Sequence, residues 1–109
     1  MVVDILGTPY TITEKSASED KNLDNCDGYC DWTTKTIVVE REMIGTLGDM
    51  DYYVKKVKRH EIVHAFLFES GLSESSHRSE AWARDEEIVD WIAYNGEKIY
   101  QAWKQAGAV

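Results

Sequence analysis

The segment from Arg59 to Phe66 contains the pattern H-E-x-x-H, formed by His60, Glu61 and His64. Residues four apart lie on one face of an α-helix, so both imidazoles can point at a single metal ion. Glu61 lies about 100° further round the helix, where it can reach a water on that ion without binding the ion itself. Two ligands and a general base in this arrangement are typical of zinc peptidases.

The motif requires a long helix, and the surrounding sequence predicts one. The stretch from Asp49 to Phe68 contains neither glycine nor proline, and its apolar residues recur at mostly helical spacing. Asp49 is suited to cap the amino end of this helix, and Gly71 is suited to end it. We therefore expect His60 and His64 to lie in the interior of a stable helix.

A catalytic zinc takes three protein ligands and leaves a fourth position for water, so one more donor is needed. Two imidazoles and one carboxylate favour zinc over other divalent metals. Glu86 and Asp90 lie on one helical face, while Glu87 lies about a third of a turn away. One of that pair could bind zinc while the other accepts the free N–H of a ligand histidine. The candidates for the third ligand are His77, Glu80, Glu86, Glu87 and Asp90.

The segment from Asp85 to Asp90 resembles the N-E-x-x-x-D segment of the thermolysin-like zinc peptidases, the gluzincins. This resemblance implies that Glu86 is the third zinc ligand and that Asp90 orients a zinc-bound histidine from the second shell. It covers about residues 55 to 92, and Asp85 stands where the family usually has asparagine. The larger lobes of those enzymes have no counterpart in this sequence.

Most of the chain is also similar to small metallopeptidase-like proteins encoded by phages and prophages of Gram-positive bacteria. The similarity is carried by residues 27–31, by residues 37–39 and by the run from His60 to Gly71. It implies a zinc peptidase class and a location in the host cytoplasm, and it indicates little about the substrate.

Length and charge limit the other possibilities. The 109 residues, 43% of them hydrophobic, suit a single domain spanning residues 1–109. The net charge of −8 would repel a phosphate backbone, so we expect no nucleic acid partner. No apolar run approaches the roughly 20 residues that cross a bilayer, and the first residues do not resemble a signal peptide, so we expect a cytoplasmic protein without a membrane partner. Cys26 and Cys30 are expected to be free thiols.

Short runs of β-forming residues precede the motif helix. Residues 2–6 and 8–15 predict one hairpin, and residues 28–32 and 36–40 predict a second. The polar, acidic stretch 16–27 has no period and is predicted to be a mobile loop. We expect a small antiparallel sheet, with an edge strand that could accept a peptide by strand addition.

Further helices are predicted after the motif. Ser79 is suited to cap a second helix that carries Glu86, and Asn95-Gly96 is expected to break or kink it. Apolar residues then continue into a terminal helix that we expect to cover the core, with the tryptophans used for packing. The predicted fold class is therefore α+β and zincin-like: a small antiparallel sheet, the H-E-x-x-H helix and one or two more helices.

The leading hypothesis is a zinc-dependent metallopeptidase that acts on a peptide or protein, with Glu61 as general base. The alternative is a catalytically inactive, zinc-containing module that binds peptides. An acidic mimic of DNA is disfavoured because the acidic residues are dispersed along the chain. His77, Tyr29 and Tyr94 could each polarise a substrate carbonyl, but their spacing singles out none of them. The sequence does not indicate an oligomeric state.

Overall fold

A computed structural model describes residues 1–43, 45–76 and 82–109. Within these residues a four-stranded sheet precedes the helices, which confirms the predicted α+β class. The strands are β1 (Val2–Ile5), β2 (Thr8–Lys15), β3 (Gly28–Asp31) and β4 (Thr36–Glu40). The α-helices are α1 (Met50–Glu69), α2 (Leu72–Ser75) and α3 (Glu86–Gln105), and short 3-10 helices are η1 (Lys21–Asp24) and η3 (Trp82–Arg84).

The sheet is mixed, whereas the sequence predicted an antiparallel one. Its strand order is β1-β2-β4-β3, with antiparallel pairing at both ends and parallel pairing between β2 and β4. Both predicted hairpins form, and the first turns tightly at Leu6 and Gly7, which have φ angles of 51° and 88°. The second hairpin inserts β4 beside β2 and leaves β3 at the edge. Local sequence pattern determined the strands but not this order.

The segment between β2 and β3 was predicted to be a mobile loop, but the structure gives it defined contacts. It contains η1, whose N-cap Asp20 accepts a hydrogen bond from the backbone N–H of Asn22. Ser16 and Leu23 are both buried. A single apolar side chain without a repeating neighbour produces no periodicity, so Leu23 did not reveal the packing of this segment.

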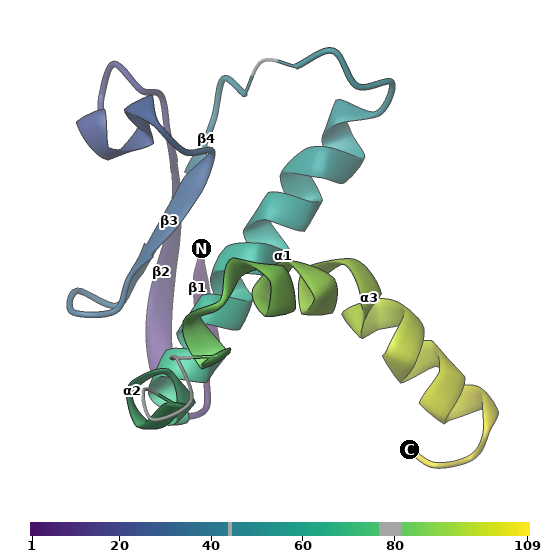
Figure 1. The fold of residues 1–109 in the computed structure, drawn as a ribbon. Coiled ribbons are helices and arrows are strands. Elements are labelled where there is room, and N and C mark those ends of the chain that lie inside the picture. Colours follow the sequence, from purple (N-terminus) through teal and green to yellow (C-terminus); the bar gives the residue numbers. More distant parts are fainter. Residues whose placement is uncertain (44, 77–81) are drawn as a thin grey trace.

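Helix α1 packs against one face of the sheet (Figure 1). Its N-cap is Asp49, as predicted, whose side chain accepts from the N–H of Tyr52 at 2.9 Å. At the other end, Glu69 accepts from the hydroxyl of Tyr10 at 2.7 Å and from Lys35 Nζ at 2.5 Å. The core between sheet and helix consists of Ile5, Tyr10, Ile12, Ile37, Val39, Val57 and Ala65. Burying each large aliphatic side chain stabilises the fold by roughly 1.5–3 kcal/mol, which fixes α1 on the sheet.

Helix α3 begins later than predicted. Ser79 lies outside the described residues, residues 82–84 form a 3-10 helix, and α3 starts at Glu86 with Asp85 as its N-cap. The Asp85 carboxylate accepts from the N–H of Glu87 at 2.8 Å. The helix is not broken at Asn95-Gly96 but continues to Gln105, although its direction changes partway along (Figure 1).

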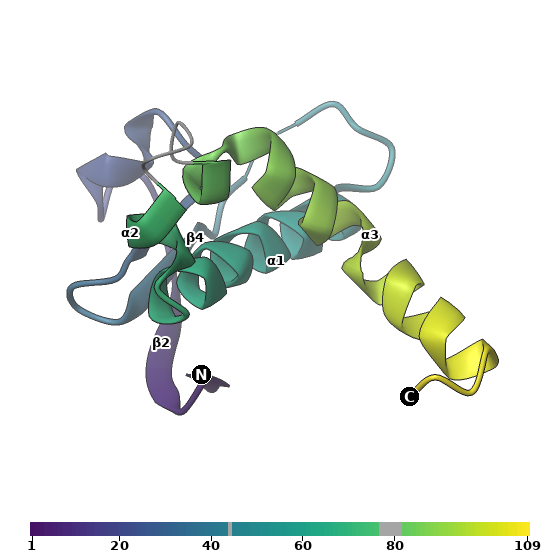
Figure 2. The same cartoon turned by 60° about the horizontal axis from the view of Figure 1, so that its bottom comes forward.

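The prediction that the terminal helical residues cover the core is wrong. Only Val89 and Ala93 of α3 are buried, and the second half of the helix projects away from the sheet and α1 (Figures 1 and 2). The four tryptophans are between 41% and 57% exposed, so they are not core residues. Among the described residues, no helix combines the length and apolarity needed to cross a bilayer.

Candidate metal centre

His60 and His64 lie side by side on the face of α1 that points away from the sheet core. Their Nε2 atoms are 3.2 Å apart, and their rings meet edge to face with centroids separated by 4.8 Å. Both side chains are largely buried, with 14% and 24% of their surface exposed. Burial lowers the pKa of His64, which favours the neutral imidazole that a metal requires.

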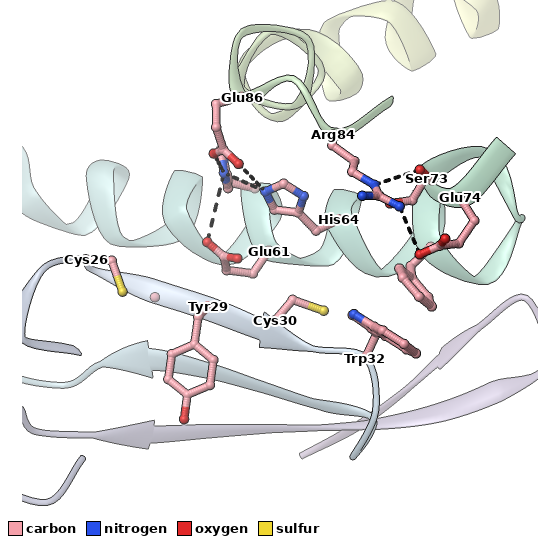
Figure 3. Close-up of a pocket in the computed structure, with 13 residues that line it drawn as sticks. Cys26, Tyr29, Cys30, Trp32, Glu61, His64, Ser73, Glu74, Arg84 and Glu86 are labelled. Atoms are coloured by element: carbon pink, nitrogen blue, oxygen red, sulfur yellow. Dashed lines mark hydrogen bonds and ion pairs between the residues drawn. The ribbon is translucent and has the colours of Figure 1, made fainter. Parts of the chain in front are cut away.

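Glu86 reaches both imidazoles from the first turn of α3. Its Oε2 lies 2.8 Å from Nε2 of His60, and its Oε1 lies 3.0 Å from Nε2 of His64. Figure 3 shows the Glu86 side chain pointing from α3 toward His64. Two imidazole nitrogens and one carboxylate therefore converge, which is the juxtaposition that the gluzincin resemblance implied for Glu86.

Asp90 contacts the far side of His60. Its Oδ1 lies 2.8 Å from Nδ1 of His60 and 3.2 Å from Nζ of Lys56. Burial raises the pKa of Asp90, but the hydrogen bonds from His60 and Lys56 outweigh it, and the pKa lies below its ordinary value. Asp90 is therefore an ionised acceptor, and its hydrogen bond holds the His60 ring in one orientation.

This hydrogen bond determines the protonation of His60. An ionised carboxylate can only accept, so Nδ1 of His60 carries the proton, and Nε2 of the neutral ring then has only a lone pair. That lone pair faces Glu86 Oε2, another acceptor, at 2.8 Å. Two acceptors this close need a proton shared between them or a metal ion that both of them bind. The contact between His60 and Glu86 is therefore compatible with a bound metal ion.

The spacing of the donor atoms fits a small tetrahedral ion. Zinc bonds of about 2.0–2.1 Å place neighbouring ligand atoms about 3.3 Å apart. The two Nε2 atoms are 3.2 Å apart, Oε2 of Glu86 lies 2.8 Å from that of His60, and Oε1 of Glu86 lies 3.0 Å from that of His64, all close to this value. Ligand atoms of His60, Glu61 and His64 also lie within 4.8 Å of one another. Glu61 is therefore near enough either to contact a water on the same ion or to bind the ion itself.

Glu61 lies between α1 and the sheet and is 7% exposed. Its Oε2 lies 4.0 Å from Nε2 of His60, a longer approach than that of Glu86. The pKa of Glu61 is raised to about 7, chiefly by burial and in part by the negative charge of Glu86, which together outweigh the opposing positive charges of His60 and Lys56. A carboxylate with a pKa near neutrality can both take up and release a proton, which suits a general base.

Gly28, the first residue of β3, allows the strand to approach Glu61. A Cβ atom at this position would lie 2.9 Å from the carbonyl oxygen of Val38, 3.2 Å from Cγ1 of Val57 and 3.4 Å from Cγ of Glu61. The first of these contacts is with backbone, which cannot turn aside as a side chain can. Only glycine therefore fits here without shifting β3 relative to β4 and α1.

A pocket of about 600 Å³ opens between β3 and α1 beside the histidines (Figure 3). Trp32 and Phe68 stack at one end of it, with ring centroids 3.9 Å apart. Arg84 borders the pocket and has two partners. Its Nε donates to the carbonyl oxygen of Ser73 at 2.8 Å, and its Nη2 lies 2.9 Å from Oε1 of Glu74. The pocket therefore has an aromatic end and a charged rim, and the candidate metal ligands lie on its surface.

Other residues singled out from the sequence lie elsewhere. His77 and Glu80 are outside the described residues. The hydroxyl of Tyr29 donates to Asp20 and points away from the histidines, and Tyr94 is 43% exposed with Lys56 Nζ over its ring. Cys26 and Cys30 are free thiols that line the pocket.

The sequence interpretation missed two supporting residues, Lys56 and Gly28. Lys56 precedes His60 by four residues, so helical spacing alone places it on the same face of the helix as His60 and His64. It is only 8% exposed, and its Nζ lies within 5.0 Å of the Tyr53 ring centroid as well as contacting Asp90. Gly28 left no such signal, because its close approach to Glu61 depends on contacts between segments distant in the sequence.

Comparisons with models of known protein families, with curated proteins and with solved structures gave no match.

Proposed function

We propose that this protein is a zinc-dependent peptidase that hydrolyses peptide bonds in a peptide or protein substrate. The observation that carries the proposal is the convergence of Glu86 on both Nε2 atoms of the H-E-x-x-H histidines, at 2.8 and 3.0 Å. The buried Glu61 supports it, because a carboxylate with a pKa of about 7 is matched to proton transfer at neutral pH.

Each residue of the centre has a distinct role in this proposal. His60, His64 and Glu86 would hold the zinc ion, which supplies Lewis acidity toward the scissile carbonyl and the attacking water. Asp90 accepts a hydrogen bond from Nδ1–H of His60 and would keep the Nε2 lone pair directed at the ion. Glu61 takes a proton from the attacking water and later donates it to the leaving amine nitrogen, a role worth about 10²- to 10⁴-fold in rate.

Strand β3 suits a substrate in extended conformation. It pairs with β4 on one side only, so its other side is an edge of the sheet within the described residues. Residues of β3 also line the pocket beside Glu61 and the histidines. A peptide that adds to this edge would form backbone hydrogen bonds with β3 and place alternate side chains in the pocket.

One observation favours the alternative of a catalytically inactive, zinc-containing module that binds peptides. Glu61 lies close enough to both histidines to be a fourth ligand, and four protein ligands would close the shell against water. The two possibilities differ in what Glu61 does for metal affinity. As a base it contributes little to zinc binding, whereas as a ligand it contributes strongly.

The test is the variant Glu61→Gln, compared with Glu87→Gln as a control for loss of an acidic side chain near the site. We expect Glu61→Gln to bind one zinc per chain with an affinity within a few-fold of wild type, and to lose at least about 100-fold in cleavage of a peptide library. Elemental analysis, competition with a zinc-binding dye and mass spectrometry of the digest measure the two effects. Cleavage at the wild-type rate would contradict the role of the base, and loss of zinc would favour the closed site.

The same proposal covers location and partners. Both cysteines are free thiols, which suits the reducing cytoplasm of a bacterial host. With a net charge of −8, we expect neither nucleic acid nor an anionic membrane surface to be a direct partner. Binding assays with DNA fragments and with vesicles containing anionic lipid would check this.

A further inference from the structure

The second half of α3, residues 95–105, is here called the C-terminal arm. Figures 1 and 2 show it projecting away from the sheet and α1, with no other described element beside it. Tyr100 and Trp103 of the arm are 45% and 53% exposed, and Ile99 is only partly buried. Large apolar side chains that project together from a helix in this way mark a surface for association.

The exposed residues form one stripe along the arm. Gly96, Ile99 and Trp103 follow at intervals of three and four residues, and Tyr100 borders them on one side. The stripe continues the face of α3 on which Val89 and Ala93 are buried against the body of the protein. The arm therefore presents a helix-packing face without a helix on it among the described residues.

Gly96 lies in the middle of this stripe. Glycine destabilises a helix interior relative to alanine, so its presence here requires a reason. A Cβ atom on Gly96 would meet only Cγ2 of Ile92, at 4.0 Å, so the packing of the described chain does not demand a glycine. Close approach of a second helix would explain the glycine, because a residue without a side chain lets another helix come near the backbone.

The charges on the arm are self-complementary. The last nineteen residues contain only Glu97, Lys98 and Lys104 as charged side chains, so basic side chains outnumber acidic ones here although the whole chain has a net charge of −8. Glu97 and Lys104 are seven residues apart and therefore lie on one flank of the stripe, whereas Lys98 lies on the other side. In an antiparallel pair of identical helices, the same flanks face each other.

We propose that the C-terminal arm is the contact surface of a homodimer, in which two arms pack antiparallel about a two-fold axis near Tyr100 and Gln101. In this register Glu97 of each copy lies beside Lys104 of the other, so the ion pair forms twice. Trp103 of each copy packs on the other helix between Gly96 and Ile99. The contact is small, so the dimer is weak and forms at micromolar concentrations.

The test is sedimentation velocity of the full chain over a range of concentrations at physiological salt. The wild-type mass is expected to rise from the chain mass of 12.5 kDa toward twice that value and to stop there. Lys104→Glu places like charges together twice and should raise the dissociation constant about tenfold. Trp103→Ala should raise it by at least about 30-fold. The exchange Glu97→Lys with Lys104→Glu should restore it to within about threefold of wild type.

Lys98→Glu is the matched control, because it changes the net charge by the same amount as Lys104→Glu but lies off the contact flank. It should leave the dissociation constant within about twofold of wild type. Circular dichroism of each variant at low concentration checks that α3 still folds. A wild-type chain that stays monomeric, a mass that grows beyond the dimer, equal effects of Lys98→Glu and Lys104→Glu, or failure of the double exchange would each overturn the proposal. None of these outcomes depends on zinc or on peptidase activity.

Discussion

The first half of α3, from Glu86 to Ala93, and the C-terminal arm share one apolar stripe but have different surroundings. The first half crosses α1, buries Val89 and Ala93, and brings Glu86 and Asp90 to His60. The arm continues the same helix, but its aromatic residues remain exposed. The presence of an apolar face therefore does not decide whether a helix is packed within its own chain.

The difference lies in polar contacts as well as in apolar burial. Three residues of α1 contact the first half of α3. Lys56 pairs with Asp90, and Nε of Arg59 donates to the carbonyl oxygen of Ala93 at 2.7 Å. His60 contacts both Glu86 and Asp90. The arm has no such partner from α1 among the described residues. The two helices are thus joined where the candidate metal centre lies, and they separate beyond it.

The strongest test of this contrast is removal of the carboxylate that the first half of α3 supplies. Glu86→Ala should weaken zinc binding by at least about 100-fold, because one of three proposed ligands is lost. Glu87→Ala, one residue along and without a side-chain contact to the histidines, should leave zinc affinity within about twofold. Competition titration with a chelating dye measures both, and equal affinities for the two variants would exclude Glu86 as a ligand.

The charge of Glu86 also reaches Glu61 in the metal-free protein. Burial together with this charge raises the pKa of Glu61 from 4.5 to about 7. Glu61 therefore holds its proton more tightly in the folded chain than in the unfolded chain. The folding stability that this provides is complete below about pH 4.5 and is lost as the pH rises through about 7. Glu61→Gln stays neutral, so at about pH 8 it should be more stable than wild type by about 1–3 kcal/mol.

Urea denaturation in the presence of a chelator measures this difference. The gap between Glu61→Gln and wild type should close as the pH falls to about 5. A gap that is independent of pH would show that the substitution acts through packing instead of charge.

Asp90 provides a smaller effect from the same half of the helix. Asp90→Asn keeps an oxygen acceptor near Nδ1 of His60 but removes its charge, so zinc affinity should fall by about 10- to 100-fold. Zinc should still bind with the same stoichiometry, since no ligand is lost. Unchanged affinity would mean that Asp90 does not orient His60.

The smallest effect compares packing in the two halves directly. Val89→Ala removes fully buried methyl groups and should cost about 1–3 kcal/mol of unfolding free energy. Tyr100→Ala, in the arm, should cost less than about 0.5 kcal/mol in dilute solution, although it removes a larger side chain. Urea denaturation in the presence of a chelator gives both values. A larger cost for Tyr100→Ala would show that the arm is packed within the monomer.

Local spacing along a helix determined which features could be predicted. The four-residue intervals between His60 and His64 and between Glu86 and Asp90 follow from helical geometry, and the structure brings these four residues together. The bounds of α1 followed from its cap and from the absence of breakers. Such features depend on residues that are neighbours in the chain.

Features that depend on distant segments were not predictable in this way. The parallel pairing of β2 with β4 results from where the second hairpin docks, and β-forming residues carry no information about that partner. The start of α3 was placed too early, because Ser79 and Asp85 are both suitable caps and only the contacts of Glu86 with α1 distinguish them. Gly28 and the exposed arm likewise reflect tertiary packing.

The absent side chain at Gly28 has a consequence for how a substrate would be held. A Cβ atom at Gly28 would lie 3.4 Å from Cγ of Glu61, so the close approach of β3 to the Glu61 side chain depends on glycine at this position. In the proposed peptidase, an extended peptide bound along β3 would lie beside Glu61 at a distance that the backbone of Gly28 sets. Even a methyl group at this position would then change both how such a peptide is seated and how near it lies to the proposed base.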